Sequence, residues 1–281
     1  MLILQSMPPC QALRMYVRAY AQRKTQIADV PIFEPVPARL EQTLEFQFGD
    51  LYDVCFSGGL QLLSPPIVVV GLQTQLRADI RLYGQIESFA VFFQPSGFSQ
   101  LFGIPMVKFL NQAYEATSVY GSDLRAIWNR LGESSSFTDR VSIIERFLLR
   151  LAACAPVTDS IAVSANRFLA LRGIVSVSAL AGQSGLSLRH FERRFFEGVG
   201  LPPKRFARIA RFQTALDAKV ANPDLTWLHI AHDLDYFDQM HMVHDFQKLG
   251  GDSPSRVLAR LGDLRPEALA SSGVESLQTR L

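Results

Sequence analysis

The sequence is poor in cysteine. Cys10, Cys55 and Cys154 are an odd number, lie far apart and form no C-x-x-C spacing. Because a disulfide scaffold and a zinc ribbon both need grouped cysteines, both are excluded. This cysteine usage favours a reducing cytoplasm.

Long apolar runs are also missing. Runs such as Ile67–Leu72 are far shorter than the roughly 18 residues of a membrane-spanning helix. The first residues carry no basic segment ahead of an apolar one, so we expect no secretory signal and no membrane partner. The 281 residues are 48% hydrophobic and 19% charged, a globular composition with enough apolar mass for about two domains.

Catalytic motifs are absent as well. The sequence has no G-x-S-x-G, no H-E-x-x-H and no P-loop lysine, and no G-x-G-x-x-G follows the apolar stretch Val68–Gly71. All five histidines lie after residue 189, so a Ser–His or Cys–His site in the N-terminal part is excluded. We expect no enzymatic activity and no cofactor.

Charge is distributed unevenly along the chain. Residues 1–159 carry a net charge of −1, residues 160–215 carry +7 and residues 216–281 carry −4. A local basic excess of this size is typical of a partner that is a polyanion, most simply nucleic acid. Charge alone is explained better by an ordinary solvated face, so binding of nucleic acid needs support from a sequence motif.

The N-terminal part has the pattern of a β-rich domain. Short segments rich in β-branched and aromatic residues are separated by Gly and Pro, which predicts an antiparallel sandwich or barrel. The predicted strands are Leu44–Phe48, Tyr52–Phe56, Ile67–Gly71 and Ser88–Phe93.

Helical periods begin after Pro105, with helices predicted over Ser122–Leu131 and Thr138–Ala153. The second helix has an apolar stripe that either mediates dimerisation or packs on the domain's own sheet. The stripe consists of Val141, Ile144, Leu148 and Leu151.

The organisation that follows is α+β with two domains. Residues 1–155 form the β-rich domain with its C-terminal helices, and Ala155–Asp159 reads as a linker. Residues 160–261 are all-α, and residues 262–281 form a polar, loosely attached tail.

The last third contains an internal repeat. The pairs Phe195/Phe246, Gly200/Gly251 and Pro203/Pro254 are 51 residues apart, while Ala181/Ala231 and Gly185/Asp235 are 50 apart. The difference predicts two copies of one unit, the second with one extra residue in its turn.

Each copy has a small buried residue in a short helix, a left-handed turn position and a good N-cap before an amphipathic helix. The turn positions are Gly185 and Asp235, and the caps are Ser187 and Asp238. This order is the signature of a helix-turn-helix unit.

At these residues the sequence resembles a known family. Val177–Phe212 is similar to the first helix-turn-helix and connecting helix of AraC-type transcription regulators. His229–Leu258 is similar to the second, including the I-A…D-Q-x-H…F…G…S-P pattern. Gly84–Gly132, with Phe93–Phe98 and Leu101–Pro105, resembles N-terminal domains of some of these regulators.

The resemblance implies a cytoplasmic regulator that binds double-stranded promoter DNA through tandem helix-turn-helix units. A β-rich sensing or dimerisation domain precedes them, which implies a homodimer, RNA polymerase as a partner and a small-molecule effector. Activation is the expected mode of regulation, with repression left open. The main alternative is an N-terminal domain that serves only oligomerisation or partner docking.

In the first unit, Leu188, Phe191 and Phe195 fall on one helical face and are expected to anchor the second helix in the core. The N-terminal part of such a helix enters the major groove. Arg189 and Arg193 are i, i+4 neighbours that can pair bidentately with guanine.

Glu192 is expected either to accept a hydrogen bond from cytosine N4 or to orient an arginine through a salt bridge. Phosphate contacts are predicted for Ser187, Arg194, Lys204, Arg205 and Arg208, while Arg211 matches a family position with a structural role.

The second unit departs from the pattern. His244 stands where arginine is common, and Asp245 is expected to add negative charge beside it. Gln239 can read adenine, Met240 can touch a thymine methyl, and His244 completes the predicted base contacts. The expected core residues are Met242 and Phe246. This unit is therefore predicted to contribute less affinity than the first.

Two further hypotheses are weaker. The pairs His229/His232 and His241/His244 resemble metal-ligand spacing, but His241 matches a family position with a packing role and the other pair lies on a short, partly exposed helix, so we expect no metal. A DNA-repair enzyme with an alkyl-accepting cysteine is the remote alternative, and the three cysteines lack the tetracysteine arrangement of that chemistry.

Overall fold

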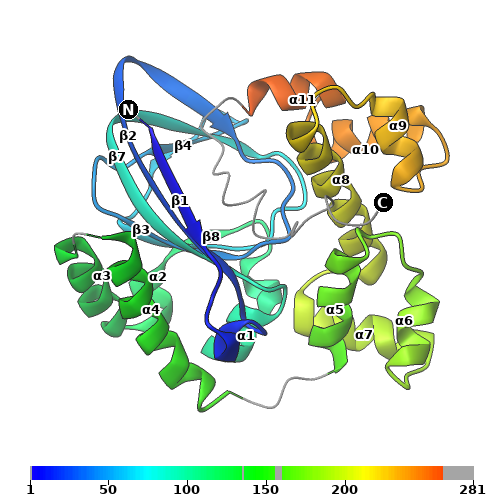
Figure 1. The fold of residues 1–281 in the computed structure, drawn as a ribbon, viewed down its shortest axis with the longest axis horizontal. Helices are drawn as coiled ribbons and strands as arrows, with labels where there is room; N and C mark the ends of the chain where they lie inside the picture. Colours follow the sequence, from blue (N-terminus) through cyan, green and yellow to red (C-terminus); the bar gives the residue numbers. More distant parts are fainter. Residues whose placement is uncertain (1, 135, 156–159, 262–281) are drawn as a thin grey trace.

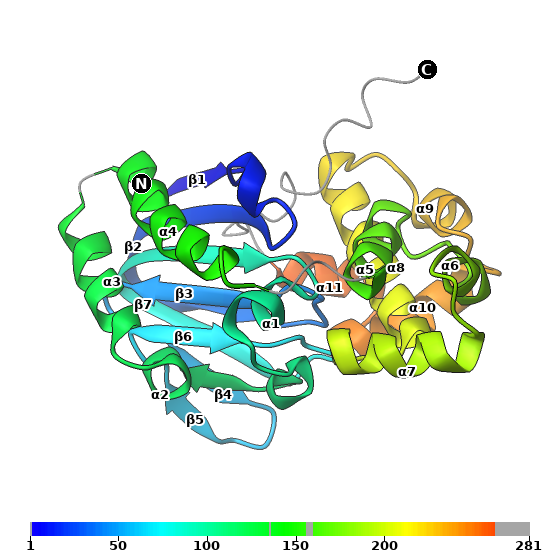
Figure 2. The ribbon, with the colours of Figure 1, turned by 90° about the horizontal axis from the view of Figure 1, so that it is seen from below.

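The protein folds into a curved β-sheet flanked by helices, followed by an all-helical region (Figures 1 and 2). The structure is a computed structural model and describes residues 2–134, 136–155 and 160–261. Residues 156–159 of the predicted linker Ala155–Asp159 and the predicted tail at 262–281 lie outside the described residues. Within the described ranges, no helix has the length and apolarity needed to cross a membrane.

Eight strands form one antiparallel sheet, in agreement with the predicted β-rich fold. The long strand β7 pairs with β2 on one side, and on its other side it pairs first with β4 and then with β3. The strands are β1 (Ile3–Met7), β2 (Val17–Pro35), β3 (Thr43–Gln47), β4 (Asp53–Phe56), β5 (Gln61–Leu63), β6 (Ile67–Val70), β7 (Ala78–Phe93) and β8 (Ala113–Glu115).

The sequence analysis missed β2, the longest strand. Its middle reads Gln-Arg-Lys-Thr-Gln at residues 22–26, a polar run that hides the alternation of a half-buried strand. Arg23 is tolerated there because its guanidinium lies 3.0 Å from a carboxylate oxygen of Glu34 near the end of the same strand. This ion pair forms only when the sheet folds, so the sequence alone gives no sign that Arg23 belongs to a strand.

Helices cover one face of this sheet (Figure 2). They are the short 3₁₀ helix η1 (Gln11–Leu13), α1 (Gly97–Phe102), η2 (Met106–Phe109), α2 (Ala116–Tyr120), α3 (Asp123–Glu133) and α4 (Phe137–Ala152). Helices α3 and α4 match the two predicted helices within one or two residues at each end.

The apolar stripe of α4 packs on its own sheet, so the interpretation of this stripe as a dimer helix is wrong. Ile144 and Leu148 are fully buried, and the ring of Phe137 lies 6.0 Å from that of Phe89 on β7. The buried Arg140 also donates from Nη2 to Glu87 on β7 at 2.6 Å. Because the sheet already covers these side chains, they offer no surface to a second copy.

The remaining helices form the C-terminal region. They are α5 (Ser160–Ala170), α6 (Val177–Gln183), α7 (Leu188–Val199), α8 (Pro203–Ala221), α9 (Trp227–Asp233), α10 (Gln239–Gly250) and α11 (Pro254–Arg260). Helix α8 is the longest of them and connects α7 to the second half of the region (Figure 1).

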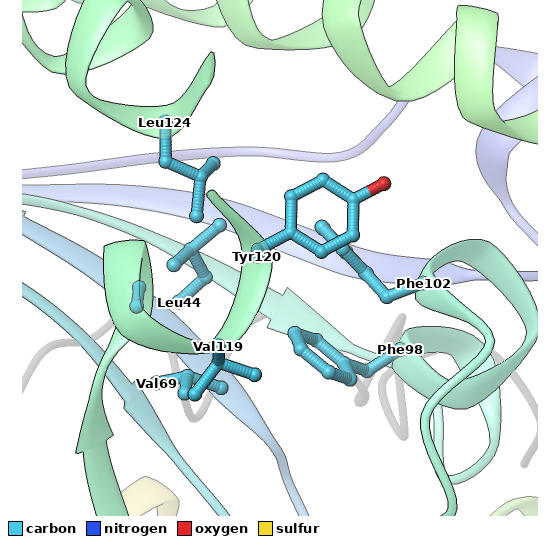
Figure 3. A pocket seen from close by; sticks show the side chains of 8 residues that line it. Leu44, Val69, Phe98, Phe102, Val119, Tyr120 and Leu124 are labelled. Carbon is cyan, nitrogen blue, oxygen red and sulfur yellow. The ribbon is translucent and has the colours of Figure 1, made fainter. Parts of the chain in front are cut away.

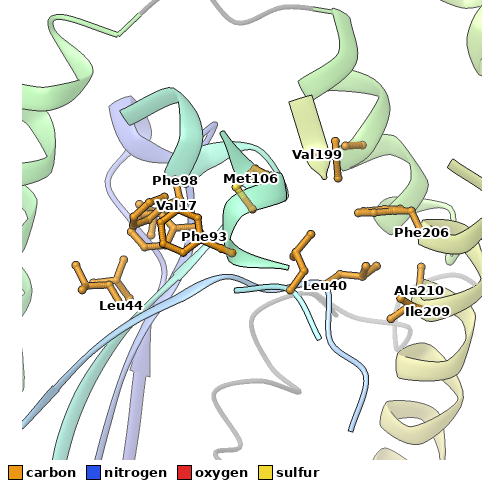
Figure 4. Close-up of a cluster of buried hydrophobic side chains, with 14 of the residues drawn as sticks. Val17, Leu40, Leu44, Phe93, Phe98, Met106, Val199, Phe206, Ile209 and Ala210 are labelled. Carbon is orange, nitrogen blue, oxygen red and sulfur yellow. The ribbon is translucent and has the colours of Figure 1, made fainter. Parts of the chain in front are cut away.

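One continuous apolar core joins the β-rich part to the helical region. Figure 4 shows Leu40 and Met106 from the N-terminal part between the sheet side chains and those of Val199 and Ile209. All four are at most 1% exposed. Burial of this kind is the main source of cohesion between packed elements.

Polar contacts surround this core. The backbone N–H of Ala38 donates to the carbonyl of Leu249 on α10 at 2.9 Å. Gln213 on α8 accepts from the N–H of Leu40 at 3.2 Å and donates to the buried carboxylate of Glu41 at 2.6 Å. At the edge, Arg260 pairs with Asp79 at 2.8 Å. The segment before β3 is therefore held against both α8 and α10.

Glu41 remains ionised in this interface. Burial alone would raise the pKa of its carboxyl, but the charges of Arg18 and Arg39 and the hydrogen bond from Gln213 outweigh it and hold the pKa below its ordinary value. A lowered carboxyl pKa contributes stability that is present above about pH 4.3 and is lost as the solution becomes more acidic than the folded-state pKa.

Replacing Gln213 with glutamate is therefore expected to weaken the interface. At pH 7 the new carboxylate cannot donate to Glu41 and repels it, which should lower the free energy of unfolding by about 2–3 kcal/mol in urea titrations. The control is Thr214→Val, because the Thr214 hydroxyl donates within its own helix, to the carbonyl of Ala210 at 2.9 Å. The deficit of Gln213→Glu should shrink in acid, where a protonated carboxyl can donate; a deficit that is equal at pH 3.5 and pH 7 would contradict this account.

Candidate nucleic-acid interface

The first helix-turn-helix unit consists of α6, a three-residue turn and α7. Gly185 has φ +66°, and the N–H of Leu186 donates back to the carbonyl of Ala181 at 3.0 Å. Ser187 then caps α7 by accepting from the N–H of His190 at 3.4 Å. Ala181 is 2% exposed, so its small side chain lets the two helices approach closely, as the sequence predicted.

The predicted reading residues of α7 lie on its outer side. Arg189 and Arg193 are exposed, and Glu192 is half-buried. An ion pair on this helix joins Arg193 to Glu197, one turn further on, at 4.0 Å. Arg194, predicted to contact phosphate, is half-buried.

Leu188 does not anchor α7 in the core, so that prediction is wrong. Its side chain is 47% exposed, whereas Phe191, Phe195 and Val199 are fully buried. Leu188 stands seven residues before Phe195, which places it only about 20° from the centre of the buried face, because each residue turns the helix by about 100°. Its exposure follows instead from its place at the start of α7, where neighbouring elements do not cover this face. The first residue of α7 is part of the exposed surface instead.

The second unit repeats this geometry with α9 and α10. Asp235 has φ +55°, and the N–H of Tyr236 donates to the carbonyl of Ala231 at 3.0 Å. Asp238 caps α10 by accepting from the N–H of His241 at 2.7 Å. The predicted turn residue and cap are therefore confirmed in this unit as well.

The outer side of α10 carries the predicted residues of the second unit. Gln239 and His244 are exposed and Met240 is 58% exposed. Met242 and Phe246 are fully buried, which confirms them as core.

His241 has the expected packing contact. Its ring lies edge-on to the Tyr236 ring at 5.4 Å. On α9, His229 lies 3.2 Å from Asp233. Among the described residues, no group of three or more histidine, cysteine, aspartate and glutamate side chains could hold a metal ion.

Arg208 and Asp245 form an ion pair inside the helical region, which the sequence analysis missed. The Nε of Arg208 on α8 lies 2.6 Å from the Oδ1 of Asp245 on α10, and the Asp245 side chain is 2% exposed. Asp245 therefore does not add negative charge to the outer face of α10, and its charge is compensated within the fold. This ion pair is the observed contact of the Arg208 side chain, which is 34% exposed, and the phosphate contact predicted for Arg208 stays a prediction.

Arg211 is structural, as predicted. Its guanidinium lies 4.9 Å from the centre of the Tyr236 ring, and its Nη1 donates to the carbonyl of Asp235 at 3.4 Å. Arg211 thereby supports the turn of the second unit from α8.

The other predicted phosphate contacts occupy helix starts. Ser187 caps α7, while Lys204 and Arg205 lie exposed in the first turn of α8. Side chains at such positions can reach the DNA backbone beside a helix that enters the groove.

Replacing Arg208 with alanine should destabilise the helical region, because the buried carboxylate of Asp245 would lose its counter-charge. We expect the free energy of unfolding to fall by roughly 3 kcal/mol, near the lower end for a broken buried pair because Arg208 is partly exposed. Lys204→Ala is the matched control and should change stability by less than about 0.5 kcal/mol. Urea unfolding followed by circular dichroism measures both, and equal stability of the two variants would refute the structural role of Arg208.

Comparisons with known proteins agree with this geometry. Residues 180–260 match a family described as a helix-turn-helix domain, and residues 5–115 match a family described as a domain of unknown function, DUF6597. A search of curated proteins gave no match.

Among solved structures, ToxT from Vibrio cholerae O395 is similar with 11% identity, a TM-score of 0.48 and coverage of 92% of this chain and 98% of that chain. Wild-type ToxT with bound unsaturated fatty acid, from V. cholerae strain SCE256, shows 9% identity, a TM-score of 0.45 and coverage of 92% and 95%. The AraC-like transcriptional activator CuxR shows 12% identity, a TM-score of 0.26 and coverage of 75% and 86%.

The assignment rests on the helix-turn-helix match and on the two capped units that lie within it. An antiparallel β-sheet domain precedes these units. The two units are the same segments whose sequences resemble AraC-type regulators. Residues 180–260 therefore form a helix-turn-helix domain of the AraC type, and this domain makes the chain a DNA-binding transcription regulator.

Proposed function

We propose that this regulator binds promoter DNA by placing α7 and α10 in successive segments of the major groove. The observation that carries the proposal is that both helices expose polar or basic residues at their N-terminal halves while their C-terminal ends contact the β-rich part. Gly200 at the end of α7 lies against Met106, and Gly251 at the end of α10 lies against Leu76. The ends available to DNA are therefore the capped N-terminal ends.

The proposed base contacts are divided between the two units. Arg189, Glu192 and Arg193 would read the first segment, with arginine selecting guanine. Gln239, Met240 and His244 would read the second. Ser187, Arg194, Lys204 and Arg205 would fix the register through phosphates.

The domains proposed for this activity are residues 1–155 and 160–261. We infer that the protein acts in the cytoplasm as a homodimer that contacts RNA polymerase, because paired sites raise the affinity of each half through linkage. The buried stripe of α4 is not the dimer surface, so a homodimer must use another face.

Arg193→Ala tests the base-reading role. We expect a loss of about 1–3 kcal/mol on a selected operator and a relaxed base preference at one or two positions. Lys204→Ala should instead weaken operator and random DNA by similar factors and reduce the salt slope by about one. Fluorescence anisotropy measures the affinity of each variant for operator and for random DNA. If Arg193→Ala lowers both affinities by the same factor, Arg193 is a phosphate contact.

We further propose control by an effector or a partner acting on the N-terminal part. An apolar pocket lies between the sheet and α1, α2 and α3, close to the sheet-facing core (Figure 3). It is lined by Leu44, Val69, Phe98, Phe102, Ala116, Val119, Tyr120 and Leu124.

The side chains around this pocket are packed so closely that no room for a water molecule remains. The ring of Tyr120 lies 4.3 Å from that of Phe102 and closes one side. A ligand would have to be apolar and would have to displace the short helix α2. The competing proposal is that the N-terminal part serves only oligomerisation or docking, which the close packing of this pocket favours.

A thermal-shift screen of the full-length protein against small apolar metabolites separates the two proposals. A ligand at 100 times its Kd stabilises the folded state by about 2.7 kcal/mol, which should raise the melting temperature by roughly 5–10 °C. Val119→Phe adds bulk where a ligand would have to open the packing and should abolish the shift. A shift that survives in Val119→Phe would place the ligand elsewhere, and no shift across the panel would favour the docking proposal.

A further inference from the structure

Phe237 is the most exposed of the large apolar side chains among the described residues, at 91%. It lies between Tyr236, which is 6% exposed, and the helix cap Asp238. A phenylalanine in this position removes no apolar surface from water in the folded protein alone. This exposure leaves the apolar ring available to another molecule.

Comparison of the two units identifies Phe237 as the inserted residue of the second turn. The turn hydrogen bonds made by the N–H groups of Leu186 and Tyr236 are both 3.0 Å long and lie 50 residues apart. The caps Ser187 and Asp238 lie 51 residues apart. The extra residue therefore stands between Tyr236 and Asp238, and Phe237 has no counterpart in the first unit.

Local helix chemistry does not account for this side chain. An apolar residue before the cap often packs against the fourth residue of the helix as a hydrophobic staple. In the second unit that fourth residue is Met242, which is fully buried, whereas Phe237 is 91% exposed, so no staple forms. In the first unit, Phe191 belongs to the core and Leu186 is partly buried against it.

Phe237 stands beside the reading end of α10. The first two residues of this helix are Gln239, which is exposed, and Met240, which is 58% exposed. At the position of Met240 the first unit has Arg189. The second unit thus offers an apolar surface where the first offers a cation. The carboxylate of Asp238, which adjoins Phe237 in the sequence, accepts a hydrogen bond from the N–H of His241.

We propose that Phe237 and Met240 contact thymine C5-methyl groups in the major groove, so that the second unit selects its site through those methyls. Apolar side chains read thymine by this contact, since the methyl is the one apolar group on a base edge in that groove. DNA is the occupant favoured here because this end of α10 continues the proposed reading surface and lies opposite the end that contacts Leu76. The inference rests on the proposed DNA-binding function.

The test removes single methyl groups from the DNA. Full-length protein first selects an operator from random duplexes, and each thymine is then replaced in turn by deoxyuridine. Loss of one buried methyl contact should weaken binding about fourfold, measured by fluorescence anisotropy at constant salt. We expect this loss at one or two thymines.

Phe237→Ala and Met240→Ala should bind the unmodified operator more weakly and should lose the sensitivity to deoxyuridine at those thymines. Leu228→Ala is the matched control, because Leu228 on α9 is 62% exposed and lies outside the proposed contact. It should keep the wild-type sensitivity.

The outcomes separate this inference from the proposed function. Failure to select any sequence would overturn both. Selection of an operator on which no thymine is sensitive to deoxyuridine would overturn the methyl contact and leave the proposed function standing. A Phe237→Ala protein with unchanged operator affinity and altered sedimentation would assign the exposed ring to a protein interface and would also overturn the inference.

Discussion

The placement of the two reading helices depends on a single shared support, the β-rich part against which both of them end. Gly200 and Gly251 close α7 and α10 with nearly the same backbone angle, φ +84° and +83°. A Cβ on Gly200 would lie 3.1 Å from Met106, and one on Gly251 would lie 2.5 Å from Leu76. Glycine is needed at both places for conformation and for space. The C-terminal ends of α7 and α10, which are equivalent in the repeat, therefore contact different segments of the same β-rich part.

The contacts between the two parts combine an apolar core with a few directional bonds. The apolar side chains supply cohesion without orientation. Gln213 and Leu249 bond to backbone and carboxylate groups of residues 38–41, and these bonds fix the rotation of the helices against the sheet. Inside the helical region, the pair Arg208–Asp245 ties α10 to α8 in the same way. The second unit is therefore positioned from two sides.

Features set by local chemistry were predictable from the sequence. A left-handed turn residue, a capping side chain and a small residue at a helix crossing depend on neighbours within a few positions, so Gly185, Asp235, Ser187 and Asp238 could be identified without a structure. The spacing of the repeat and the one-residue difference in its turn were equally visible. The family resemblance followed from these positions.

Features set by distant partners were not predictable. The charge on Asp245 looked like part of the outer surface until Arg208, 37 residues earlier, was seen to neutralise it. The stripe on α4 fitted a dimer as well as its own sheet, and only the position of β7 decides between them. Strand β2 was missed because the charge in its polar run is balanced by a residue eleven positions later, Glu34, which the folded strand brings to Arg23. Leu188 shows a further difficulty: it lies on the buried face of α7 by helical angle, but as the first residue of the helix it stands where no neighbouring element covers that face.

The support at the C-terminal ends of α7 and α10 makes each helix a lever. Each has 12 residues, which corresponds to a length of about 18 Å. A rotation of about 5° at the supported end would move the opposite end by about 1.6 Å, roughly half the 3.4 Å rise between base pairs. A small change in the curvature of the sheet would thus be amplified at the base edges. Because both levers share one support, such a change would alter the spacing between the two reading ends and with it the preferred separation of the two DNA segments.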